Sequence, residues 1–234
     1  MTALVTYQLK DGIATLAMDD GKVNVMSLPM LAELNGALDR AAADRAAVVL
    51  TGRPGTFSAG FDMKVLGAGG ADALKLLITG FETAERLLSF PHPVVIACTG
   101  HAIAMGVFLV LSGDYRVGAD GAYKIGANEV AIGLTMPRFG VEVCRQRLAP
   151  AHFHRAVINA EFYTPAESVA AGFLDRLVPD AEVLGEALAV AARLAKLPRP
   201  VHTATKLRAR EQALKAIRAA IEADDSEFSA LGNR

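Results

Sequence analysis

The stretch Pro-Gly-Thr-Phe-Ser-Ala-Gly-Phe-Asp-Met-Lys, residues 54–64, decides the fold class because it joins two kinds of element. It follows the apolar run AAVVLTG at residues 46–52, which is typical of a buried strand. Gly60 permits a sharp turn, and we expect Phe61 to open a helical segment, with Asp62 as a helix-start residue. The ordinary interpretation is a strand-to-helix loop; the alternative is that the backbone of this loop binds something.

A second stretch has the same character. In TGHAIAMGVFLVL, residues 99–111, an apolar strand again passes through glycine and small residues into a helix. Backbone N–H groups at a helix N-terminus have no intrahelical acceptor. Two such donors aimed at one point would hold a carbonyl oxygen as it gains negative charge, which is an oxyanion hole. Glycine-containing turns before helices are frequent, so this pattern alone leaves both interpretations open.

The rest of the chain alternates strands with helices, which predicts an α/β fold. An alternating hairpin surrounds Asp11-Gly12, and Ser27 is a candidate N-cap for a helix over residues 27–45. Further expected elements are helices at 71–90 and 102–113, a strand at 92–100, and two short strands around a turn within 114–126. Two helices divided at Pro150 follow, and then, within 164–179, a helix capped by Thr164 and the strand LDRLV. Residues 181–223 are helical and rich in alanine. We therefore expect a core at residues 1–180 and a helical region at residues 181–234.

Composition excludes several classes of protein. Of the 234 residues, 52% are hydrophobic and 21% charged, which is typical of a globular chain with a large core. The net charge of −1 gives no reason to expect nucleic acid or an anionic membrane as partner. The longest apolar run is too short to span a bilayer, and the N-terminus does not resemble a leader peptide. The two cysteines lack ligand spacing, which predicts a reduced protein without a structural metal. Together with the N-terminus and the short apolar runs, this leads us to expect a cytoplasmic protein.

Five motifs together resemble the crotonase, or enoyl-CoA hydratase/isomerase, superfamily. They occur in the family's order and spacing over nearly the whole chain: VNVMS (23–27), RPGTFSAGFDMK (53–64), TGHAIAMG with GDYRV (99–117), GANEVAIGL (126–134) and TPAESVAAGFLDRLVP (164–179). The resemblance implies a ClpP/crotonase-like spiral of ββα units with a helical C-terminal trimerisation region, assembled as a homotrimer or a dimer of trimers. It also implies an acyl-CoA thioester as substrate and no separate cofactor, since CoA arrives with the substrate.

The resemblance also implies the roles of individual residues. The two oxyanion donors correspond to the backbone N–H groups of Phe61 and Met105, while Asp62 is mainly structural. The residues that correspond to CoA or substrate contacts are Phe57, Ser58, Ala59, Phe61, Lys64, Phe108 and Lys206. Among them, Phe108 is expected in the pocket wall, and Lys64 and Lys206 are candidates for a CoA phosphate contact.

The acid/base residues select the reaction. Hydratases of this superfamily use two glutamates to split water; Glu129 matches the second, but Phe108 stands at the position of the first. One carboxylate suits a proton shuttle, so the pattern favours an enoyl-CoA isomerase, in which an apolar pocket should raise the pKa of Glu129. The alternatives are a hydratase, another reaction such as thioester hydrolysis, or a non-catalytic acyl-CoA-binding paralogue. Glu142 is either a solvated partner of Arg145 or a second acid.

Overall fold

A six-stranded sheet forms the centre of the fold in the computed structural model, which describes residues 3–232. Its strands in spatial order are β1 (Val5–Lys10), β2 (Ile13–Met18), β4 (Ala47–Thr51), β7 (Val94–Cys98), β9 (Tyr115–Asp120) and β11 (Arg176–Pro179). The first two strands form the predicted antiparallel hairpin, and the other neighbours are parallel.

Two smaller sheets pack beside this large one. Strands β10 (Ile125–Gly126), β8 (Gly100–Ile103) and β5 (Gly55–Ser58) form a parallel three-stranded sheet, and β3 (Val25–Met26) pairs with β6 (Gly60–Phe61). The pairs β4/β5, β7/β8 and β9/β10 each place their first strand in the large sheet and their second in the small one. This repetition confirms the predicted α/β spiral of ββα units.

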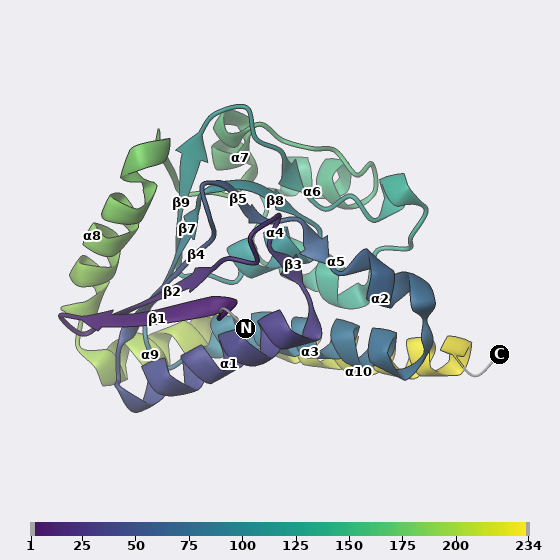
Figure 1. The fold of residues 1–234 in the computed structure, drawn as a ribbon, viewed down its shortest axis with the longest axis horizontal. Coiled ribbons are helices and arrows are strands. Elements are labelled where there is room, and N and C mark those ends of the chain that lie inside the picture. Colours follow the sequence, from purple (N-terminus) through teal and green to yellow (C-terminus); the bar gives the residue numbers. More distant parts are fainter. Residues whose placement is uncertain (1–2, 233–234) are drawn as a thin grey trace.

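The helices cover both faces of the large sheet (Figure 1). They are α1 (Leu28–Ala43), α2 (Met63–Ala68), α3 (Gly70–Ser89), α4 (Met105–Leu111), α5 (Arg138–Arg145), α6 (Pro150–Val157), α7 (Pro165–Ala171), α8 (Val183–Ala195), α9 (Arg199–Ala209) and α10 (Glu211–Gly232), with 3₁₀ turns at Val130–Ile132 (η1) and Asp180–Glu182 (η2). Local sequence explains their starts. The Ser27 side chain caps α1 by accepting from the Met30 N–H, and Thr164 begins α7 with a capping box to Glu167.

Alternating strand residues create two cores. In β4, Val48 and Leu50 face the larger core, whereas Val49 faces a smaller one that helix α8 completes. Figure 1 shows α8 on one side of the large sheet, opposite most other helices. Ile217 and Ile221 of α10 lie in the larger core. Helices α8 and α10 are therefore packed into the same body as residues 1–180, and the predicted boundary at residue 180 does not separate two packing units; a role of this region in oligomerisation stays a prediction.

The helices of the described residues are unsuited to spanning a membrane. No helix between residues 3 and 232 has both the length and the apolar composition needed to cross a bilayer.

Candidate active site

The three-stranded sheet brings three distant segments to one place. Its central strand, β8, pairs Ala102 with Ser58 of the 54–64 loop on one side. On the other side it pairs with β10, and the Ala104 N–H donates to the Gly126 carbonyl at 3.1 Å. Glu129 follows Gly126 by three residues. Because the three strands are parallel, their C-terminal ends lie at the same end of this sheet. Both loops that the sequence singled out and the candidate acid therefore lie at that end.

Gly60 is the point at which the two loops touch. Its φ is +93°, and a Cβ atom added there would lie 2.9 Å from the Ala104 Cβ and 3.5 Å from the Met105 nitrogen. A side chain at this position would therefore clash and also strain the backbone. The predicted turn at Gly60 is confirmed. The lack of a side chain there also lets the two loops approach each other closely.

Phe61 does not open a helix, contrary to the prediction. It belongs to the short strand β6, which pairs with β3, and helix α2 begins two residues later at Met63. Asp62 is the N-cap, and its carboxylate accepts from the Lys64 N–H at 2.9 Å. The structural role predicted for Asp62 is confirmed. The pairing of β6 with a strand far along the chain overrides the local helix signal.

The second loop enters helix α4 through a strained residue. Ala104 has φ 51° and ψ −124°, a conformation that costs a non-glycine residue about 1–3 kcal/mol and that clusters at functional sites. Met105 is the first residue of α4, so its backbone N–H has no acceptor within the helix. A Cβ added at Gly106 would lie 2.5 Å from the Ser58 carbonyl oxygen, so the first turn of α4 rests directly on the 54–64 loop.

Glu129 is a buried carboxylic acid at the start of η1. Its exposed fraction is 8%, and its Oε2 atom has no hydrogen-bond partner among the residues that the structure describes. Burial raises the pKa of Glu129 to about 7, although its own backbone N–H acts in the opposite direction. At neutral pH both protonation states are populated, so this carboxyl can accept a proton and return it.

Helix α5 forms an apolar wall that borders both Phe108 and Glu129. Phe108 is buried and meets Phe139 edge-on at 5.8 Å between ring centroids, and a Cβ at Gly140 would lie 2.8 Å from its Cζ. One turn further along α5, burial and, to a lesser extent, the charge of Glu129 raise the pKa of the Cys144 thiol. The predicted apolar surroundings of Glu129 are thus present, and the phenyl ring at position 108 offers no polar atom to hold water.

Phe57 and Ser58, two predicted CoA contacts, use their side chains inside the fold. Phe57 is fully buried, and the Ser58 hydroxyl donates to the Asn24 carbonyl at 2.7 Å and accepts from the Gly60 N–H at 3.1 Å. Any contact of these two residues with a ligand would therefore come from their backbone. Ala59 is half-buried, and Lys64 is exposed at the first turn of α2, where its ammonium remains free to reach an anion.

Lys206, the predicted phosphate contact of the C-terminal region, is bonded inside the fold. Its ammonium contacts an Asp114 carboxylate oxygen at 2.6 Å and donates to the carbonyls of Phe90 and His92, each at 2.9 Å. With a side chain only 4% exposed, it joins α9 to the end of α3. These internal bonds use all three hydrogens of the ammonium, which contradicts the predicted phosphate contact. The sequence showed a basic amphipathic helix but not which basic residue faces inward.

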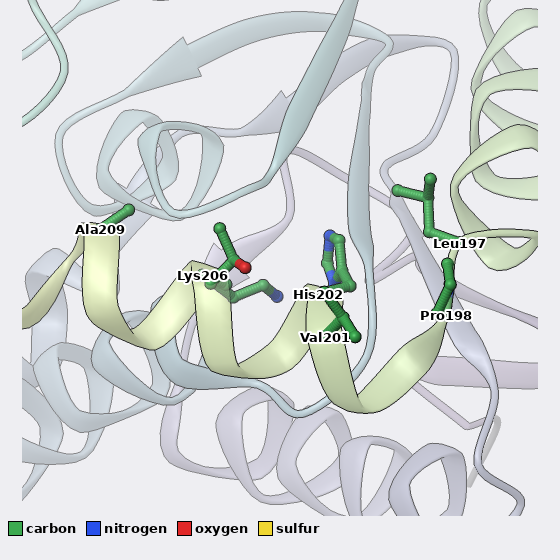
Figure 2. A pocket seen from close by; sticks show the side chains of 7 residues that line it. Leu197, Pro198, Val201, His202, Lys206 and Ala209 are labelled. Atoms are coloured by element: carbon green, nitrogen blue, oxygen red, sulfur yellow. The ribbon is translucent and has the colours of Figure 1, made fainter.

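The surface hollow beside Lys206 is distinct from the Glu129 segment. The hollow runs along α9 (Figure 2), has a volume of about 360 Å³, and is lined by Leu197, Pro198, Val201, His202, Thr205, Lys206 and Ala209. Its lining is almost entirely apolar and includes none of the other predicted site residues. The hollow is therefore separate from Glu129, and His202 is the one histidine among the residues that line it.

Two further polar residues that the sequence raised, Glu142 and His101, are each bonded to a neighbouring residue of the protein. Glu142 pairs with the exposed Arg145 at 3.2 Å, which matches the interpretation as a solvated pair. His101 Nδ1 accepts from the Lys124 N–H at 3.0 Å beside the site. Across residues 3–232, no group of three or more His, Cys, Asp or Glu side chains is arranged to hold a metal ion.

Asn24 is a site-building residue that the sequence did not single out. It is fully buried with φ 52°, and its side-chain amide donates to the carbonyls of Met18 at 3.0 Å and Phe57 at 3.2 Å. The Asn24 amide thereby links the 54–64 loop to the end of strand β2. A polar residue between apolar neighbours in VNVMS was the available signal, because buried amides need internal partners.

Comparisons with known proteins show the family to which the chain is similar. The family described as enoyl-CoA hydratase/isomerase matches residues 8–234. Rat mitochondrial enoyl-CoA delta isomerase 1 is 29% identical over 99% of this chain and 82% of its own length. A probable enoyl-CoA hydratase of Mycobacterium tuberculosis is 30% identical over 78% of this chain and 70% of its own.

Solved structures show the same similarity in three dimensions. The apo structure of an Mtb enoyl-CoA isomerase superposes with a TM-score of 0.94 at 46% identity, covering 97% of this chain and all of that one (100%). The family match over residues 8–234 and the shared overall fold agree, and the chain belongs to the enoyl-CoA hydratase/isomerase family.

Proposed function

We propose that this protein isomerises an unsaturated acyl-CoA, converting a 3-enoyl thioester to the conjugated 2-enoyl thioester. The observation that carries the proposal is the buried carboxyl of Glu129, whose pKa is raised to about 7, in a site where position 108 holds phenylalanine. Relatives that carry the names isomerase and hydratase are both similar to this chain, so the reaction is argued from the site.

The proposed mechanism moves one proton along the substrate. The Glu129 carboxylate takes a proton from C2, and the electron pair of that C–H bond becomes delocalised onto the thioester oxygen as a dienolate. The neutral carboxyl then returns the proton to C4, and the double bond comes to lie between C2 and C3. Atoms and charge balance without water or a redox partner, so one carboxyl with a pKa near neutrality is sufficient.

The developing oxyanion is assigned to the backbone N–H groups of Phe61 and Met105. Support comes from the contact of their loops at Gly60 and from the position of Met105 at the start of α4. Donors held in place before the reaction stabilise charge without reorganising, and removal of one such donor typically lowers kcat by about 10²–10³. Lys64, free on the surface of α2, is proposed to meet a CoA phosphate; assembly as a trimer or a dimer of trimers also remains a proposal.

Hydration is the second candidate, and Phe108 argues against it. Addition of water across a double bond requires one group to activate the water and another to protonate the carbon. Phe108 is buried among apolar side chains and can supply neither. Thioester hydrolysis also needs an activated water, and a non-catalytic acyl-CoA-binding role would leave the raised pKa of Glu129 without a use.

The test is conversion of 3-hexenoyl-CoA to 2-hexenoyl-CoA, followed by the absorbance of the conjugated thioester. We expect turnover by the wild type, with kcat/KM rising with pH through about 7 as Glu129 loses its proton. Glu129→Gln should abolish turnover while it retains affinity for butanoyl-CoA, and Glu142→Gln, the matched surface control, should keep wild-type rates. Rapid hydration of crotonyl-CoA without isomerisation would overturn the proposal, and binding without either reaction would favour the non-catalytic role.

A further inference from the structure

Gly80 lies in the middle of helix α3, among the residues that the helix buries. A Cβ atom at Gly80 would lie 2.5 Å from the Phe61 Cζ, would also overlap Phe61 Cε1, and would be 3.6 Å from the Met105 Sδ. Alanine is a better helix former than glycine at such a position. What glycine provides at position 80 is therefore space for the Phe61 ring against the α3 backbone.

The two residues that meet at Gly80 are the two proposed oxyanion donors. Their side chains converge on this one position of α3, while their backbones approach each other at Gly60. The Phe61 ring is also held by Phe81, edge-on at 6.0 Å between centroids. Contacts at Gly60 and Gly80 thus locate residues 61 and 105 relative to each other from two directions.

We propose that Gly80 is a positioning residue that sets the separation of the Phe61 and Met105 N–H groups by seating both side chains on helix α3. This inference rests on the proposed oxyanion role of those two groups. A side chain at position 80 would push the Phe61 ring away from α3, and strand β6, only two residues long, would transmit that displacement to the Phe61 backbone. A displacement of about 1 Å in a catalytic group can lower the rate by roughly 10²-fold.

The first experiment is Gly80→Ala, compared with Gly36→Ala. Gly36 lies in helix α1, and a Cβ added there meets nothing within 4 Å, so it reports the general effect of a helical glycine-to-alanine change. We expect Gly80→Ala to lower kcat and kcat/KM for isomerisation equally, by about 10- to 100-fold, because oxyanion contacts strengthen in the transition state. Gly36→Ala should stay within twofold of wild type.

Rescue by Phe61→Leu separates positioning from simple damage to the fold. Leucine lacks the Cε1 and Cζ atoms that occupy the Cβ position of residue 80. In a double-mutant cycle, Gly80→Ala combined with Phe61→Leu should recover at least about 10-fold of the kcat lost by Gly80→Ala alone. If Gly80→Ala fails to fold, the folded double variant decides; wild-type kcat in Gly80→Ala, or additive losses in the cycle, would overturn the proposal.

A readout without turnover distinguishes failure of this inference from failure of the proposed function. Acetoacetyl-CoA can bind as its enolate, whose absorbance reports stabilisation of the oxyanion, whereas butanoyl-CoA reports ordinary binding. We expect Gly80→Ala to reduce the enolate fraction about 10-fold or more with little change in the Kd of butanoyl-CoA. Absence of isomerisation in the wild type would refute the proposed function alone, while an unchanged enolate fraction in Gly80→Ala would refute the role of Gly80. A wild type that forms no bound enolate would refute the oxyanion role of Phe61 and Met105, and with it the role of Gly80.

Discussion

Replacing Glu129 by glutamine should change how the stability of the protein depends on pH. The folded protein holds the pKa of this carboxyl at about 7, against 4.5 for an ordinary glutamate. At 1.36 kcal/mol per pKa unit, that difference corresponds to about 3 kcal/mol of folding free energy. Because the raised pKa arises from burial, the charged carboxylate destabilises the folded state.

The sign of the effect follows from which state binds the proton. Below about pH 4 both states are protonated; between pH 4.5 and about 7 the unfolded chain loses the Glu129 proton while the folded protein keeps it. Wild-type stability therefore falls as pH rises through this window, by about 3 kcal/mol from this group. Glutamine does not titrate. Its buried amide adds a cost that is the same at every pH, so the pH dependence isolates the carboxyl.

Urea unfolding from pH 4 to pH 8 measures the prediction. The free energy of unfolding of Glu129→Gln, minus that of the wild type, should increase by about 3 kcal/mol across the series and level off near pH 8. Glu142→Gln, which alters an exposed ion pair, is the control and should follow the wild type over the neutral range. Parallel curves for the wild type and Glu129→Gln would refute the argument that burial raises this pKa.

Two further substitutions test how the fold supports the site. Asp114→Ala leaves the nearly buried Lys206 and Arg210, now 2.6 Å and 2.9 Å from its oxygens, without their counter-charge. It should lower the free energy of unfolding by about 3–5 kcal/mol in urea, and a loss below about 1 kcal/mol would contradict the buried network. Asn24→Ala removes the bond to the Phe57 carbonyl, so it should cost about 1–3 kcal/mol and also lower isomerase kcat. An unchanged melting temperature would show that the 54–64 loop does not depend on this amide.

Elements whose signals lie within a few residues could be predicted from the sequence. Ser27 and Thr164 cap the helices expected of them, and the Asp11-Gly12 hairpin is present, because capping and turn chemistry are local. Phe61 shows the limit of such signals. It looked like the first residue of a helix, but pairing with β3, more than thirty residues earlier in the chain, made it a strand residue.

The sequence by itself determined the family, the two glycine-containing loops, and the presence of a glutamate at position 129 and a phenylalanine at position 108. Only the tertiary structure decided that Lys206 faces inward, that both loops meet at Gly60, and that the Phe61 ring rests on Gly80. It also decided that the pKa of the Glu129 carboxyl is about 7. The physical reason is range: motifs and caps depend on neighbouring residues, whereas desolvation and close contact depend on atoms that folding brings together from distant parts of the chain.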